Sequence, residues 1–182
     1  MKRLIGLCLI ICMAVSFCAC GKKEDTLKVG DSAATDRAAV MMMEAEFTET
    51  GRFSNLEYEI KWNLDNNIIY FNFEFAIKNI GETVLDDKMR NPQGYPYSDQ
   101  LGAYVELYYA DEKYVTLNKY PDYVYDMTTE DEHFNIPVGE THTIFARFTL
   151  PRQAMTDGKP IYVNIKLPNS KGEFETFKYT LR

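Results

Sequence analysis

The chain has 182 residues, of which 46% are hydrophobic and 26% charged, and its formal net charge is −7. This length suits a single domain with its own core, and the acidic balance argues against nucleic acid as a partner, because phosphate neutralisation needs a basic face. The four cysteines are confined to the N-terminus, so the domain that follows cannot form a disulfide; they are Cys8, Cys12, Cys18 and Cys20.

The N-terminal segment has the pattern of an export signal. Lys2 and Arg3 precede an uncharged, largely apolar run over residues 4–19, and this order of charged, apolar and small residues is typical of secretory signals. The run is shorter than the roughly 20 apolar residues that a membrane-spanning helix needs. A cleaved signal over residues 1–19 therefore fits better than a permanent span.

The end of this signal, "FCAC" from Phe17 to Cys20, resembles a bacterial lipobox, although Leu is commoner at the position of Phe17. The resemblance implies cleavage before Cys20 and thioether lipidation of that residue. Two acyl chains suffice for stable anchoring, so we expect a protein held at the cell membrane and facing the extracytoplasmic side, with residues 20–26 as anchor and tether. A plain secreted signal and an uncleaved anchor are the alternatives.

Residues 27–182 read as strands. Over residues 38–49 every second side chain is apolar, which predicts a strand with Ala39, Met41, Met43, Ala45 and Phe47 on one face. Residues 56–62, "LEYEIKW", alternate in the same way. The turn residues of 64–67 then predict a hairpin leading into the next strand.

The strongest strand pattern covers residues 68–79, with Ile69, Phe71, Phe73, Phe75 and Ile77 predicted to form the centre of the core. Further strands are predicted over residues 103–109, 113–117, 141–150, 161–167 and 173–181. In two of these the predicted buried sets are Ile144, Ala146, Phe148 and Leu150, and Ile161, Val163, Ile165 and Leu167.

About eight short strands with one apolar face each, and no amphipathic helix, predict an all-β fold: an antiparallel two-sheet sandwich of immunoglobulin-like type. A parallel sheet covered on both faces would show continuous apolar runs instead. A jelly roll or a small barrel remains an alternative, and patterning does not give the order of the strands.

Several short motifs together resemble a known family. They are "LKVGDSA" (27–33), "IKNIGE" (77–82), "PVGET" (137–141) and the apolar strand that ends at Pro151. With the lipobox, they are similar to the telokin-like, immunoglobulin-like domain common in lipoproteins of Gram-positive bacteria, a family of unknown function. The resemblance covers roughly residues 27–182 and implies the fold and the location, without catalytic residues; the acidic, tyrosine-rich segment 118–132 is less typical.

Catalytic motifs are missing from the sequence. It has no G-x-S-x-G elbow, P-loop, G-x-G-x-x-G or H-E-x-x-H, so we expect neither an enzyme nor a cofactor. Zinc needs three or four convergent ligands, and the two histidines are His133 and His142. We therefore expect no metal site; a metal or small-solute carrier would require these histidines to converge.

Two long connections remain as candidate recognition loops: residues 86–100 with Tyr95 and Tyr97, and residues 118–132 with Tyr120, Tyr123 and Tyr125. Loops of this length tend to be functional or disordered, and tyrosine supplies a rigid contact at low entropy cost. We expect a binding or adaptor module whose partner is another envelope protein or a wall polymer. The tyrosines could instead cap the sandwich, or residues 120–125 could form a short strand with Tyr123 and Tyr125 alternating in and out of the core. The alternative function is a structural accessory or spacer subunit of an envelope complex.

Overall fold

The computed structural model describes residues 26–49, 67–86, 104–113, 123–130 and 135–182. The expected signal peptide, Cys20, the strand over 56–62, Tyr95, Tyr97, Tyr120 and His133 lie outside these residues. Within them, no helix is long and apolar enough to cross a membrane. The strands are β1 (Ser32–Ala34), β2 (Ala38–Thr48), β3 (Ile68–Asn79), β4 (Leu85–Asp86), β5 (Val105–Tyr109), β6 (Glu112–Lys113), β7 (Tyr123–Asp126), β8 (Asn135–Ile136), β9 (Thr141–Pro151), β10 (Ile161–Pro168) and β11 (Phe174–Thr180).

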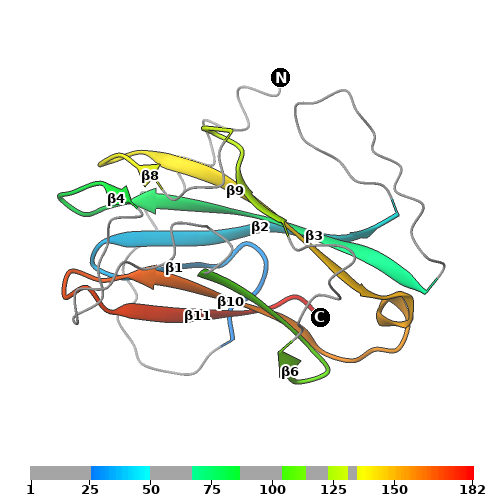
Figure 1. Ribbon diagram of the computed structural model, residues 1–182. Coiled ribbons are helices and arrows are strands. Elements are labelled where there is room, and N and C mark those ends of the chain that lie inside the picture. Colours follow the sequence, from blue (N-terminus) through cyan, green and yellow to red (C-terminus); the bar gives the residue numbers. More distant parts are fainter. Residues whose placement is uncertain (1–25, 50–66, 87–103, 114–122, 131–134) are drawn as a thin grey trace.

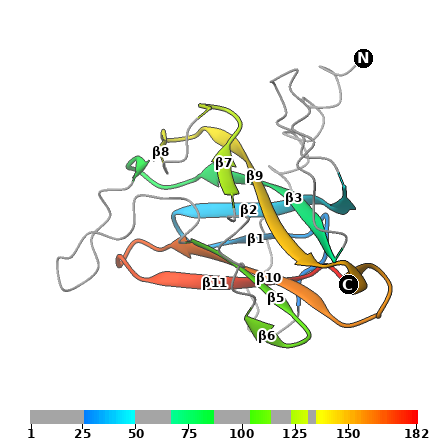
Figure 2. The same ribbon diagram turned by 45° about the vertical axis from the view of Figure 1, so that its right-hand side comes forward.

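These strands form the two layers of an antiparallel sandwich (Figure 1). Sheet I has five strands in the order β1-β2-β3-β9-β7, and sheet II has four in the order β11-β10-β5-β6. The short pair β4-β8 forms a third, two-stranded sheet. The turned view shows sheet I above sheet II, with β7 alongside β9 (Figure 2). The expected all-β, two-sheet antiparallel fold is confirmed.

The strand order is that of an immunoglobulin fold. Strands β2, β3, β9 and β7 occupy the A, B, E and D positions, and β11, β10, β5 and β6 occupy G, F, C and C′. The chain enters the domain through Leu27, which forms a parallel bridge with Tyr179 of β11 before β1 joins the other sheet. The entering segment therefore touches both layers of the sandwich.

The core is centred on β3, as its alternation predicts. Phe71, Phe73, Phe75 and Ile77 are each at most 4% exposed. The rings of Phe73 and Phe148 of β9 stack at 5.6 Å with an interplanar angle of 9°. The predicted buried sets of 141–150 and 161–167 are also confirmed, since every member is at most 4% exposed and belongs to the same core cluster.

Strand β2 corrects the predicted facing. Val40 and Met42, rather than Met41, point into the core, and Ala45 and Phe47 pack against it farther along the strand. The register explains the change, because Met42 pairs with Phe75 while Glu44 pairs with Glu74, leaving Met43 as an extra residue. A β-bulge of this kind shifts the two-residue alternation by one position. The prediction was therefore wrong before Met43 and correct after it.

Strand β7 settles the secondary structure of residues 123–126. Tyr123 and Tyr125 belong to an edge strand that pairs with β9, not to a loop. The side chain of Tyr123 lies outside the described part of the structure, so the alternative in which these two tyrosines alternate in and out of the core stays a prediction. Val124, between them, is the residue that enters the core.

Candidate recognition surfaces

The outer face of sheet I contains a buried arginine. Side chains at even positions of β3 and odd positions of β9 point away from the core, and several of them are nonetheless covered. We call these residues the arginine cluster: Tyr70, Asn72, Phe145, Arg147 and Thr149, all at most 7% exposed. Burial of so many outward-pointing side chains is unusual for a sheet face, and a buried guanidinium requires compensating contacts.

Arg147 obtains those contacts partly from aromatic rings. Its Cζ atom lies 5.0 Å from the ring centroid of Tyr70 and 5.4 Å from that of Phe145, both within the range of cation–π attraction. Its Nε atom donates a hydrogen bond to Asn72 Oδ1 at 3.3 Å. The hydroxyl of Thr149 is buried and makes no hydrogen bond within the described structure.

The pairing of β7 with β9 places two of the predicted recognition tyrosines beside this cluster. Tyr123 is in register with Arg147, and Tyr125 with Phe145. Tyr125 is half-buried. The cluster therefore reaches the β7 edge of sheet I, where an aromatic side chain from the predicted recognition set continues it.

Carboxylates lie on the same face, across β3. Glu44 is directly opposite Glu74, and Glu46 is opposite Asn72. Burial, and then the negative charges of Glu44 and Glu46, raise the pKa of Glu74. Like charges directly opposite each other on neighbouring strands are destabilising, so this region strains the sheet electrostatically.

The outer face of sheet II carries a second aromatic group, which sequence reasoning missed. The rings of Tyr108 and Tyr162 stack at 4.7 Å with an interplanar angle of 10°, and Lys178 places its Nζ atom 3.7 Å from the centroid of Tyr162. On the same face, Lys166 Nζ lies 2.7 Å from Glu106 Oε1. These residues form a second aromatic and charged surface, on the outer face of sheet II.

A buried histidine caps one end of sheet I. His142 Nδ1 lies 2.5 Å from Asp126 Oδ2, and both side chains are at most 2% exposed. The other ring nitrogen of His142 faces Glu140 at 3.4 Å, and Asp126 also accepts a hydrogen bond from the backbone of Thr128 at 2.8 Å. Both side chains are covered, so the pair is a buried polar contact that joins β7 to β9.

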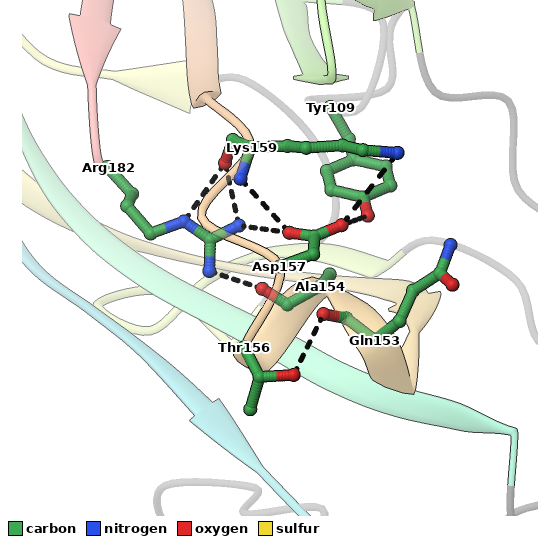
Figure 3. A network of polar contacts seen from close by, with 7 residues as sticks. All are labelled: Tyr109, Gln153, Ala154, Thr156, Asp157, Lys159 and Arg182. Carbon is green, nitrogen blue, oxygen red and sulfur yellow. Dashed lines mark hydrogen bonds and ion pairs between the residues drawn. The ribbon is translucent and has the colours of Figure 1, made fainter.

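A polar network closes the opposite region, near the C-terminal residue (Figure 3). Asp157 accepts hydrogen bonds from the Tyr109 hydroxyl and from the Arg182 guanidinium, the latter at 3.2 Å. The Tyr109 hydrogen bond is the main cause that lowers the pKa of Asp157. Arg182 also donates to the carbonyl oxygens of Ala154 and Lys159. The network ties β5, the β9–β10 connection and the end of β11 together.

A metal centre finds no support within the described residues, where no three histidine, cysteine, aspartate or glutamate side chains are grouped to hold an ion. His133 is not among these residues, so the expectation of no metal site, and the convergence of the two histidines that a carrier would require, both stay untested.

The comparisons with known proteins identify the fold. No protein-family model matches the chain, and no curated protein matches it. An uncharacterized beta-sandwich protein from Clostridium difficile 630 is similar in structure, with a TM-score of 0.55, 18% identity, and coverage of 90% of this chain and 99% of the other. The yjhA protein from Bacillus subtilis has a TM-score of 0.52 and 12% identity over 86% of this chain and 100% of its own. The chain thus has the fold of uncharacterized β-sandwich proteins.

Proposed function

We propose that the chain is a lipid-anchored, extracytoplasmic binding or adaptor module with a telokin-like domain and no catalytic activity. The lipobox-like sequence before Cys20 supports the anchor, and the immunoglobulin strand order supports the type of domain. Stable anchoring through two acyl chains would keep the module at the membrane surface.

The observation that carries the binding role is the half-buried Tyr125 at the β7 edge, which lies beside the buried arginine cluster. Tyrosine is among the residues most enriched at the energetic centres of protein interfaces. Here Tyr125 lies in register beside Phe145, which in turn contacts Arg147. The rings hold the buried guanidinium, so the cluster is a rigid support for Tyr125, the residue that the edge presents to a partner envelope protein.

The spacer function is the second candidate, and burial of other tyrosines favours it. Tyr104, Tyr109 and Tyr179 are at most 8% exposed and serve the core or its ends. Tyrosines used in this way are not available to a partner. The two candidates therefore differ in what the half-buried Tyr125 does.

Lipidation is tested first, by fractionating cells that express the full chain. We expect Cys20→Ser to abolish lipid attachment, measured by mass spectrometry, and to release the protein from the membrane or leave its signal uncleaved. Cys18→Ser is the matched control, because it changes a cysteine two residues away that the proposal assigns to the discarded signal. Equal lipidation of both variants would refute the anchor.

Partner binding is tested by crosslinking intact cells that express the lipidated protein. We expect a defined envelope partner to be captured by the native chain and by Met155→Ala, which changes an exposed apolar residue away from β7, but not by Tyr125→Ala. Both variants are checked for folding by circular dichroism. Capture that is unchanged by Tyr125→Ala, or no capture by the native chain, would contradict the recognition role and favour the spacer.

A further inference from the structure

Three charged or polar side chains are aligned across sheet II. Glu106 of β5 is in register with Asn164 of β10, and Asn164 is in register with Lys178 of β11. All three are at positions that point away from the core. The outer face therefore carries an acid, an amide and a cation in one row perpendicular to the strands, so the row is negative on one side of β10 and positive on the other.

The two outer members of this row are not equivalent. Glu106 is held by Lys166 at 2.7 Å and by the Tyr108 hydroxyl at 3.4 Å. Lys178 is exposed and lies over the ring of Tyr162; no carboxylate within the described structure forms an ion pair with it. Between them, Asn164 Oδ1 is buried and accepts no hydrogen bond from the described residues. In this part of the chain, the row thus offers a cation without an anion.

We propose that a second copy of this chain docks on the outer face of sheet II, related by a two-fold axis that runs parallel to the strands and passes over β10. Rotation about this axis places the β11 side of one copy over the β5 side of the other. Lys178 of each copy then lies opposite Glu106 of its partner. Such isologous contacts are the rule for symmetric dimers.

Charge complementarity selects this axis over the alternative. A two-fold axis perpendicular to the strands would place β11 over β11, and hence Lys178 against Lys178. With the parallel axis, Tyr162 of each copy meets Tyr162 of the other at the centre, as expected for an aromatic centre with a polar rim. Lys166 also starts near the axis, but its ammonium lies on Glu106, towards β5, so the two copies' Lys166 side chains diverge.

A sugar stacked on the ring of Tyr162 would be a less suitable occupant of this outer face than a second copy of the chain. The faces of Tyr162 are taken by Tyr108 and Lys178, so this ring has no open face for a sugar. The local charge also contrasts with the whole chain, which has a net charge of −7, because Lys166 and Lys178 are balanced by Glu106 and by Asp111, whose charge acts on Tyr162. Two copies would therefore meet at a region without net repulsion.

The parallel axis has a consequence for membrane attachment. Both copies keep the same strand direction, so the segments that enter each domain at Leu27, beside β11, point the same way. Two lipid anchors could then insert into one membrane. Confinement to that surface raises the effective concentration of the partner. The dimer itself does not depend on the anchor. If the chain did not dimerise, the proposed function would still stand, and if the proposed function were refuted, the dimer would still stand.

The experiment is a charge-reversal series on the full chain, purified from membranes in a mild detergent and measured by sedimentation velocity. We expect the native chain to dimerise, and Lys178→Glu and Glu106→Lys each to raise the dimer dissociation constant at least about tenfold. An equimolar mixture of the two variants should restore dimers. In the mixed dimer, the carboxylate introduced at position 178 of one copy faces the ammonium introduced at position 106 of the other, and the native pair of Lys178 and Glu106 forms on the opposite side. Lys171→Glu, which changes an exposed lysine in the β10–β11 turn, is the control with the same change in charge.

A native chain that stays monomeric up to roughly 100 μM overturns the proposal, since that concentration detects even weak association. Single variants that dimerise as well as Lys171→Glu, or a mixture that is not restored, overturn it too. Should Glu106→Lys fail to fold without its Lys166 contact, Asn164→Arg serves instead. It places two cations together on the axis, and the proposal requires it to be monomeric.

Discussion

The outer faces of the two sheets both hold a cation against aromatic rings, but they use it differently. On sheet I, Arg147 is 5% exposed and lies between the rings of Tyr70 and Phe145. On sheet II, Lys178 is exposed and touches one ring, that of Tyr162. A guanidinium is planar and weakly hydrated, so it stacks and tolerates burial, whereas an ammonium is a compact and strongly hydrated charge. One cation therefore stabilises its sheet, while the other is available for recognition.

The most informative test of this difference is a matched pair of substitutions. Arg147→Gln should lower the free energy of unfolding by about 3 kcal/mol, because it removes a buried group and leaves the covered Asn72 without its donor. Lys178→Gln should change it by less than about 0.5 kcal/mol, as for most exposed residues. Urea unfolding at neutral pH measures both. Equal effects would show that the two cations are not used differently.

The next largest expected effect concerns the stacked rings of Tyr108 and Tyr162 on sheet II. A double-mutant cycle with Tyr108→Leu and Tyr162→Leu should give a coupling energy of about 1 kcal/mol, the usual value for an aromatic pair. The rings are nearly parallel at 4.7 Å, so direct contact is expected to dominate. Additivity of the two single substitutions would contradict this stacking, and would weaken the case for a rigid surface on sheet II.

A small gain in stability is expected on sheet I. Glu74→Gln removes a carboxylate that faces Glu44, and should raise the free energy of unfolding by several tenths of a kcal/mol at pH 7. The pKa of Glu74 is raised in the folded protein, so its favourable contribution is fully present below its unfolded pKa and is lost as pH rises through the folded value.

Glu74→Gln should therefore show less loss of stability than the native protein as pH is raised through the acidic range. Glu82→Gln is a suitable control, because Glu82 is exposed on a turn. If both substitutions gave the same pH profile, the strain would not come from the Glu44–Glu74 pair. Thermal unfolding measured across the acidic range up to neutral pH follows the difference directly.

Strict alternation was enough to predict the strands of the core. In β3, β9 and β10 the two-residue period runs unbroken, and the structure buries the predicted side chains. The two-sheet antiparallel sandwich follows from several such strands that must each cover one apolar face. In β2 the same pattern failed, because Met43 bulges and no local feature of "MMMEAE" marks which residue is extra.

The candidate surfaces were harder to predict, because they depend on which strands become neighbours. The row of Glu106, Asn164 and Lys178 joins three strands whose pairing is set by the fold, and hydrophobic patterning does not encode their register. Arg147 was at an outward position of a strand, where exposure is the normal expectation. Of the predicted recognition tyrosines, the structure brings Tyr123 and Tyr125 to one edge strand, and their role in recognition stays a prediction.

The bulge in β2 bears on how this strand could vary among proteins of the same fold. Ala38, Val40 and Met42 point inwards before Met43, and Ala45 and Phe47 do so after it. Removing Met43 would leave these five residues in unbroken alternation. Removing a residue elsewhere in the strand would instead turn some of the core-facing side chains towards the outer face. A codon deletion inside a core strand is normally lethal to a fold; here one position can accept it, with loss only of the local twist that a bulge adds.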